Sequence, residues 1–343
     1  MDGTHLVPVQ GTYETVPGHG MPKTWGRTSF SGINRKLDKK NSFSGKNNGF
    51  AAFPKGTVAG DFLHKLIEKA VKKRITVKDG ADEALRAFIA NEMKGKAFFA
   101  GKRSLTFQRA CLERLGYREE ETPNSYSEYC ERWIGNCLRL LLTRTIPVTG
   151  GNTGIDLSAL IRSQQVVPEI DFLLKVPGDP ENGWNVGSIV RSRELAGLSL
   201  ETGTSSAEES LKGYMTGQID LLLKNTDGRY WVIDWKSNAI DTEDSCDNPR
   251  NYTRQAMEKV MDEHHYRLQA LCYTVALFRY LQLRNPEKAS DEVLGMIGGA
   301  IYVFLRGVDE ADGNLGIFCM PMERLKDSVI ALNGILSGRS GTD

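Results

Sequence analysis

The chain has 343 residues and a formal net charge of +1 at pH 7, with 40% hydrophobic and 25% charged residues. This composition excludes a wholly disordered protein, and the near-zero charge excludes a uniformly basic nucleic-acid binder. Because no apolar run reaches about 18 residues and residues 1–20 lack a signal-peptide pattern, we expect a globular, cytoplasmic protein that does not contact a membrane.

Residues 1–50 are rich in Gly, Ser, Asn and Lys and lack apolar periodicity, which is typical of a flexible arm or linker. Between Met21 and Lys55 there are eight basic residues and a single acid, Asp38. Such a segment can follow a phosphate backbone, although a solvated linker fits the composition equally well.

Residues 51–149 are mainly helical by pattern. From Thr57 to Lys73 apolar residues recur every three or four positions, which predicts a helix with one buried face. Similar patterns predict helices over residues 82–93, 105–115 and 125–142.

From residue 150 to residue 343 the pattern changes to strands flanked by helices. A glycine-rich turn and a short helix lead to a predicted strand at 169–176, and a hairpin follows over 217–224 and 229–236. A helix over 253–284, strands at 300–305 and 316–320, and a helix from Met322 complete the prediction. We therefore expect an α/β core.

Six cysteines are scattered along the chain, and no two have the C-x2-C spacing that is typical of zinc or iron–sulfur sites. In a reducing compartment the simpler interpretation is free thiols. This prediction covers the whole set, Cys111, Cys130, Cys137, Cys246, Cys272 and Cys319.

The hairpin brings acidic residues together. A three-residue loop that ends at Gly228 supplies the positive backbone angle that such loops need, and counting back along both strands then sets Asp220 opposite Asp234. Lys236 projects on the same side as Asp234 because side chains alternate along a strand. One face of the hairpin therefore carries two carboxylates and a lysine.

Two facing carboxylates among apolar neighbours destabilise a sheet unless a positive charge lies between them. Mg²⁺ prefers oxygen ligands and keeps water and substrate phosphate in its shell, and Mn²⁺ is a possible substitute. The pattern favours phosphodiester hydrolysis, with Asp220 and Asp234 on the metal and Lys236 serving the attacking water. A salt bridge of Lys236 to either acid on an exposed sheet face is the alternative, and the pattern alone leaves both open.

The spacing of Asp220 and Asp234-x-Lys236 resembles the PD-(D/E)XK nuclease motif. Residues 213–221, 228–238, 266–281 and 298–307 are similar, in the same order, to segments of the C-terminal nuclease domain of RecB, the beta subunit of exodeoxyribonuclease V. With residues 25–31 and 53–64, the resemblance extends from about residue 25 to residue 335. It implies a restriction-endonuclease-like core with a mixed central sheet flanked by helices and preceded by a helical region.

The resemblance implies roles for further residues. His64 matches the family's metal-binding histidine, although a histidine on the flank of an amphipathic helix is more often a bystander. The carbonyl of Trp235 would complete the metal shell. Glu169 would bind metal through water, with an exposed strand-end acid as the equal alternative. Gln269 and Tyr273, one helical turn apart, match a Q-x3-Y pair beside the family's active site; a packed helix face would explain only the tyrosine.

DNA is the implied substrate, cut at ends or as single strands in recombinational repair and foreign-DNA degradation. In that family a helicase precedes the nuclease, whereas this chain has no G-x4-G-K-[ST] phosphate loop, so we expect no ATP-driven unwinding by this polypeptide. RecC-like and RecD-like subunits, a helicase chain and a RecA-like recombinase are the implied partners.

Two alternatives to a RecB-type nuclease remain open. One is a non-catalytic DNA-binding or recombinase-docking module that keeps the fold, and the intact Asp220, Asp234 and Lys236 argue against it. The other is a nuclease of the AddA or Cas4 kind. The Cas4 cysteine cluster is missing here, and residues 298–307 favour RecB over AddA.

Overall fold

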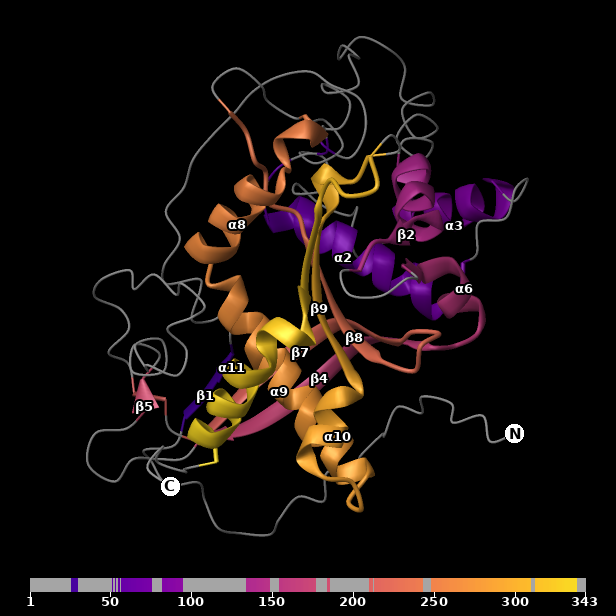
Figure 1. The fold of residues 1–343 in the computed structure, drawn as a ribbon. Coiled ribbons are helices and arrows are strands. Elements are labelled where there is room, and N and C mark those ends of the chain that lie inside the picture. The colour runs from indigo at the N-terminus through magenta and orange to yellow at the C-terminus, as the bar shows by residue number, and fades with distance from the viewer. Residues whose placement is uncertain are drawn as a thin grey trace.

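The computed structural model describes residues 26–29, 51, 53, 55, 57–75, 82–94, 134–148, 154–176, 184–185, 210–211, 213–242, 248–309 and 312–337 (Figure 1). The predicted helix at 105–115, the start of the one at 125–142 and most of the basic arm lie outside these residues. Cys137, Cys272 and Cys319 are buried, and Cys137 and Cys272 carry free thiols. No helix in the described ranges is long and apolar enough to cross a membrane.

One six-stranded mixed sheet forms the centre of the molecule. Its antiparallel pairs are β4–β7, β7–β8 and β9–β10, and its parallel pairs are β8–β9 and β1–β7. The strands are β1 (Gly26–Ser29), β4 (Val166–Val176), β7 (Gly213–Lys224), β8 (Tyr230–Lys236), β9 (Ile297–Phe304) and β10 (Ile317–Pro321). Two short pairs lie apart from it: β2 (Thr145–Ile146) with β3 (Ile155–Asp156), and β5 (Trp184–Asn185) with β6 (Ser210–Leu211).

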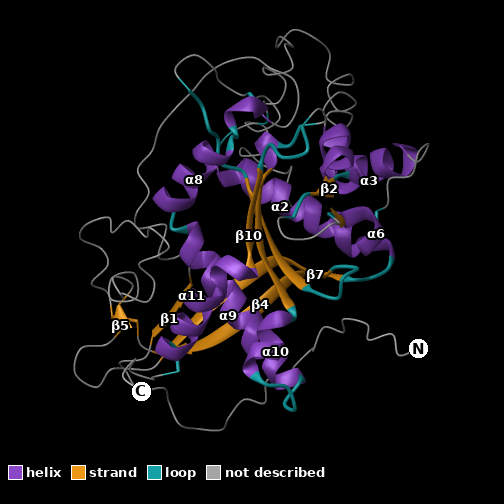
Figure 2. Cartoon of the chain, viewed as in Figure 1, coloured by secondary structure: helices purple, strands orange, loops and turns teal. Residues whose placement is uncertain are grey.

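Helices cover both faces of the sheet (Figure 2). One face packs against α8 (Arg254–Glu263), α9 (Tyr266–Arg284), α10 (Ser290–Gly295) and α11 (Met322–Ile335). The other packs against α2 (Thr57–Lys72), α3 (Asp82–Lys94), the helical residues 134–143 and α6 (Leu157–Arg162). Double coverage explains why every residue of β9 is buried. The expected α/β fold class is confirmed, and it is consistent with a PD-(D/E)XK-like core.

The single helix predicted over 253–284 is wrong. The chain forms α8 and α9, joined at His265, whose backbone has the left-handed φ of 53°. Apolar periodicity runs through both helices, so the pattern does not reveal a break that depends on one residue's backbone angle. The short helix α10 and the 3₁₀ turns η3 (Pro249–Asn251) and η4 (Leu305–Gly307) were also not predicted.

Strand β4 begins three residues before the predicted start, and it includes Pro168. Among the described strands β4 pairs only with β7, and an edge strand tolerates proline because one side of its backbone needs no partner. Within the segment predicted as an arm, Gly26–Ser29 forms β1 and pairs with residues 213–216 of β7. A local pattern cannot reveal this contact with a distant strand.

Candidate active site

The predicted hairpin register is confirmed. Gly228 has a φ of 83°, and the paired residues end at Leu221 and Ile233. The next residue toward the site on each strand is Asp220 or Asp234. The same register therefore sets the two carboxylates beside each other, at the point where the paired part of the hairpin ends.

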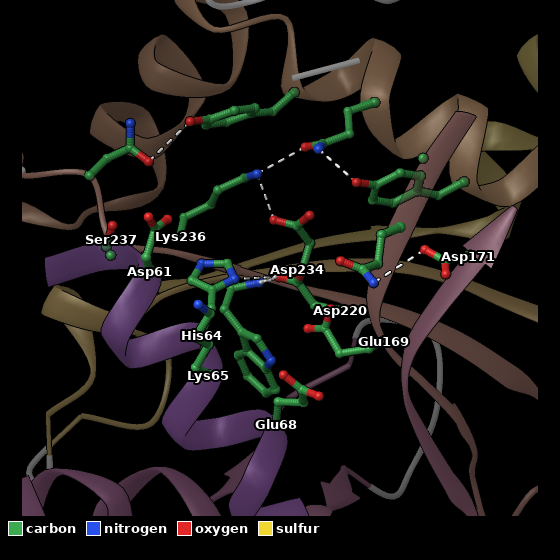
Figure 3. Close-up of a pocket in the computed structure, with 18 of the residues that line it drawn as sticks. Asp61, His64, Lys65, Glu68, Glu169, Asp171, Asp220, Asp234, Lys236 and Ser237 are labelled. Atoms are coloured by element: carbon green, nitrogen blue, oxygen red, sulfur yellow. Dashed lines mark hydrogen bonds and ion pairs between the residues drawn. The ribbon is translucent and has the colours of Figure 1, made fainter. Parts of the chain in front are cut away.

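Beyond this point β7 and β8 part. Asp234 and Lys236 continue alongside β9, whereas β7 continues alongside β4. On the β8 side of β7, residues 217–220 have no strand partner among the described strands, because β8 pairs with 221–224 and β1 with 213–216. A pocket of about 850 Å³ lies at this fork, lined by residues of α2, β4, β7, β8 and α9 (Figure 3).

His64 reaches the fork from α2. The apolar face of α2 is buried in the core, and this packing turns His64 toward Asp220 (Figure 3). His64 Nδ1 lies 3.4 Å from Asp220 Oδ2, and the Trp235 N–H donates to the same oxygen at 2.8 Å. Burial lowers the pKa of His64, but the charge of Asp220 and a hydrogen bond to it outweigh burial, so the net pKa is raised. For Asp220 the directions are opposite. Burial raises the pKa of this carboxyl, but the charge of His64 outweighs burial, so the net pKa is lowered.

The N-terminal part of α2 lies close to the loop that follows Lys236. A Cβ atom on Gly60 would lie 2.7 Å from Ser237 Oγ, so a larger residue would require the Ser237 hydroxyl to move. Arg306 is 1% exposed, and its Nε donates to the Ser237 carbonyl at 2.8 Å while its Nη1 donates to the Ala51 carbonyl at 3.0 Å. This guanidinium therefore links the segment before α2 to the Asp234–Lys236 strand.

Asp234 and Lys236 form a buried ion pair on the opposite wall. Lys236 Nζ lies 2.7 Å from Asp234 Oδ2. Asp234 is 2% exposed, and burial raises its pKa to about 6, an effect that Lys236 opposes and the charge of Asp220 reinforces. Burial lowers the pKa of Lys236, but Asp234, Tyr266 and Asp220 outweigh burial and raise it. The ion pair named in the alternative interpretation exists, but its expected position on an exposed sheet face is wrong.

The predicted Q-x3-Y pair lies beside Lys236. Lys236 Nζ donates to Gln269 Oε1 at 2.9 Å, and Gln269 Nε2 donates to the Tyr273 hydroxyl at 2.8 Å. The Tyr302 hydroxyl also donates to Gln269 Oε1, at 3.1 Å. Tyr302 and Tyr266, whose rings face Lys236, were not among the predicted site residues, and no local sequence signal distinguishes them from core aromatics.

Glu169 lies within β4 rather than at its end. Its neighbours pair with Leu221 and Ile219, which sets it opposite Asp220, and its φ of 56° is left-handed. Burial raises the pKa of Glu169 to about 7, and the charges of Asp220 and Glu68 add to the effect. The alternative of an exposed strand-end acid is therefore wrong, while the water-mediated metal role stays a prediction.

Other acids on the pocket walls were missed by sequence reasoning. Asp61 and Glu68 of α2 and Asp171 of β4 line the pocket, as does Lys65 (Figure 3). Asp61 lies three residues before His64 and Glu68 four residues after it, and this helical spacing was the available signal. Apart from Lys65 and the buried Lys236, the walls are largely acidic.

The donor set bears on which cation fits. Within the described ranges, no group of three or more His, Cys, Asp and Glu side chains gathers closely enough to hold a metal ion. Asp220 and Asp234 nevertheless offer hard oxygen donors at one point, and Mg²⁺ commonly takes one or two carboxylates with water and substrate phosphate. The side chain of Trp235 is buried in the core, and the role of its carbonyl stays a prediction. The residues fit an oxygen-preferring divalent cation.

Comparison with known proteins points in one direction, although no family model matches the chain. The chain is 32% identical to RecBCD enzyme subunit RecB of Escherichia coli over 221 residues, which are 62% of this chain and 17% of the relative. It is 36% identical to the RecB subunit of Haemophilus influenzae over 112 residues, 32% of this chain and 8% of the relative. It is 32% identical to the RecB subunit of Mycolicibacterium smegmatis over 149 residues, which are 41% of this chain and 13% of the relative.

The chain thus spans less than a fifth of the length of these curated relatives. The resemblance to RecB inferred from the motifs is confirmed over part of the chain, because the curated relatives found are all RecB subunits, and its assignment to the nuclease domain stays a prediction. Over that part, the chain is similar to RecB and consistent with a RecB-like domain.

Proposed function

We propose that this protein is a Mg²⁺-dependent deoxyribonuclease of the RecB type that hydrolyses phosphodiester bonds. The observation that carries the proposal is the convergence of Asp220, Asp234 and Lys236 where β7 and β8 part, inside a pocket. A salt bridge alone does not account for a second carboxylate beside Asp234, whereas a divalent cation, which commonly binds one or two carboxylates, does.

The cation would be held by Asp220 and Asp234, with His64 and the Trp235 carbonyl as further ligands. It supplies charge that acidifies a bound water and offsets the negative charge that grows on the phosphate. His64 would have to be neutral to bind the cation through nitrogen, so it would first give up the proton that its contact with Asp220 favours. Glu169, opposite Asp220, would contribute through water.

Lys236 keeps its proton and acts as a fixed positive charge. Its ammonium lies between Asp234 and Gln269, and it would orient the attacking water or stabilise charge on the phosphate. Gln269 and Tyr273 hold the ammonium from the α9 side and line the same pocket. No covalent intermediate with the enzyme is needed.

The substrate is DNA, cut at ends or as single strands, in recombinational repair and degradation of foreign DNA. Similarity to a RecBCD subunit supports RecC-like and RecD-like subunits as partners, with a helicase and a RecA-like recombinase as further partners.

Cleavage of linear and circular DNA, measured with Mg²⁺ and with a chelator, tests the proposal. Asp234→Ala should lower the rate at least about hundredfold, because it removes a cation ligand. Asp227→Ala is the matched control, since Asp227 is an acid of the same hairpin whose partner is Arg229 in the turn. Cleavage by Asp234→Ala at the wild-type rate would show that this fork is not the catalytic site. DNA binding without any cleavage by the wild type would favour the docking module.

A further inference from the structure

Lys236 lies against aromatic rings as well as polar partners. Its Nζ is 4.0 Å from the centroid of the Tyr266 ring and 5.2 Å from that of Tyr302. The two rings are stacked, with centroids 5.8 Å apart and planes 25° apart. A desolvated ammonium above a ring face is attracted by the negative centre of the ring. The rings therefore add to the attraction that Asp234 and Gln269 exert.

Tyr266 has a second contact in the same pocket. Its hydroxyl donates to Asn238 Oδ1 at 3.2 Å, and Asn238 lies on the loop that follows Lys236. The Asn238 carbonyl accepts a hydrogen bond from the Tyr252 hydroxyl at 2.9 Å. The side chain of Tyr266 thus contacts both the ammonium of Lys236 and the next part of the chain.

The position of Tyr266 depends on the break between α8 and α9. Tyr266 is the first residue of α9, directly after the left-handed His265. The ring of His264 stacks on that of Tyr266, with centroids 5.2 Å apart and planes 16° apart. A left-handed non-glycine residue persists only where the surrounding structure holds it. The stacked rings on either side of the break provide such surroundings.

A ring differs from a carboxylate in what it offers to a cation site. Under the proposed function Asp234 shares its charge with a divalent cation and so attracts Lys236 less. The Tyr266 ring attracts an ammonium but offers no hard oxygen to Mg²⁺ from its face. It therefore still holds Lys236 when Asp234 is engaged.

We propose that Tyr266 is a positioning residue, whose ring face holds the Lys236 ammonium in the pocket while its hydroxyl fixes Asn238. The role of Lys236 in turnover rests on the proposed function, whereas the contact between ring and ammonium does not. The test therefore needs one measurement of position and one of activity.

Position is measured by proton–carbon spectra of protein with isotope-labelled lysine. Protons above a ring face are shifted upfield, so the Lys236 Hε resonance should lie upfield of ordinary lysines, and it is assigned by its loss in Lys236→Arg. Tyr266→Phe should keep this shift, because the ring remains. Tyr266→Leu should remove much of it.

Activity is measured as kcat and KM for DNA with Mg²⁺. Tyr266→Leu should lower kcat on the order of tenfold or more, with little change in KM, and Tyr266→Phe should recover most of the loss. Tyr230→Leu is the matched control, because the Tyr230 ring also lies under a lysine ammonium, with Lys224 Nζ 5.5 Å from the ring centroid. This pair is not part of the pocket lining. Tyr230→Leu should keep the wild-type kcat and the Lys236 resonance.

Several outcomes would overturn the proposal. One is a wild-type kcat and an unchanged Lys236 resonance in Tyr266→Leu. Equal losses of kcat in Tyr266→Phe and Tyr266→Leu would assign the effect to the hydroxyl and remove the ring's role. If Tyr266→Leu does not fold, an ordinary Lys236 resonance in the wild type and in Tyr266→Phe overturns it. A wild type that cuts no DNA contradicts the proposed function, and the resonance still decides the contact.

Discussion

The two walls of the pocket hold a carboxylate in different ways. On the side of the pocket that α2 lines, here called the α2 wall, Asp220 of β7 lies 3.4 Å from His64, whose side chain is 32% exposed. On the side that α9 lines, here called the α9 wall, Asp234 of β8 lies 2.7 Å from Lys236, whose side chain is 12% exposed. The pKa of Asp220 is lowered despite burial, because His64 and Lys236 favour its charge, whereas burial raises the pKa of Asp234 to about 6.

This difference assigns different tasks to the two walls. An imidazole releases its proton near neutral pH, whereas the ammonium of Lys236, with its raised pKa, stays charged. Under the proposed function, the α2 wall would therefore exchange a proton for a divalent cation. The α9 wall is suited to keep one positive charge in place.

Removing the fixed charge should have the largest effect. Lys236→Ala is expected to lower turnover at least about hundredfold, because no group then serves the water or the phosphate. It should also lower metal-free stability at neutral pH by about 3 kcal/mol, since Asp234 stays buried without its partner. Calorimetric titration with Mn²⁺ should show nearly wild-type affinity, and Lys224→Ala is the control. If affinity falls as far as in Asp234→Ala, Lys236 is a structural counter-ion.

Removing the imidazole should have a smaller effect that depends on the metal. His64→Ala is expected to lose on the order of tenfold or more of its activity in Mg²⁺ and to recover part of it in Mn²⁺, which tolerates mixed nitrogen and oxygen ligands. Titration of activity with each metal measures this, with Lys69→Ala of the same helix as control. Superimposable Mg²⁺ titrations of His64→Ala and the wild type would leave His64 outside the metal shell.

The two walls should also differ in how stability depends on pH. The folded-state pKa of Asp234, about 6, lies above that of the unfolded chain, so the folded state binds its proton more tightly. The contribution of protonated Asp234 to the free energy of unfolding is fully present below the pKa of the unfolded chain, and it is lost as pH rises through about 6. Without divalent cations, the free energy of unfolding of Asp234→Asn, taken relative to wild type, should therefore rise by on the order of 2 kcal/mol as pH increases from about 4 to about 7.

Urea unfolding across this pH range, with a chelator present, measures the gain. Asp227→Asn in the hairpin turn is the control, because Asp227 is an acid outside the pocket. Parallel stability curves for Asp234→Asn and the wild type would contradict the raised pKa of Asp234.

The smallest expected effect concerns the basic residues between Met21 and Lys55, whose charge is opposite to that of the acidic pocket walls. If Arg35, Lys36, Lys39 and Lys40 contact phosphates, replacing them by Gln should weaken DNA binding and flatten its salt dependence. The log–log slope should change by roughly 0.7 to 0.9 per lost contact. Replacement is preferable to deleting residues 1–50, because Gly26–Ser29 pairs with β7. An unchanged slope would make the segment a tether.

The sequence by itself determined the hairpin and the placement of its two carboxylates and its lysine. Register follows from Gly228 and from strict alternation, so Asp220, Asp234 and Lys236 were assigned to one place without knowledge of the rest of the fold. The amphipathic helix that carries His64 was also determined by local periodicity. These features depend on residues close together in the chain, and a pattern can reveal them.

Only the tertiary structure decided what surrounds these residues. The approach of His64 to Asp220 depends on how α2 packs, and the rings around Lys236 come from α9 and β9. The left-handed backbone of Glu169 and His265 breaks no apolar pattern, so no periodicity reveals it. Each of these features depends on contacts between distant segments, whose free energy is set by packing and burial rather than by neighbouring residues.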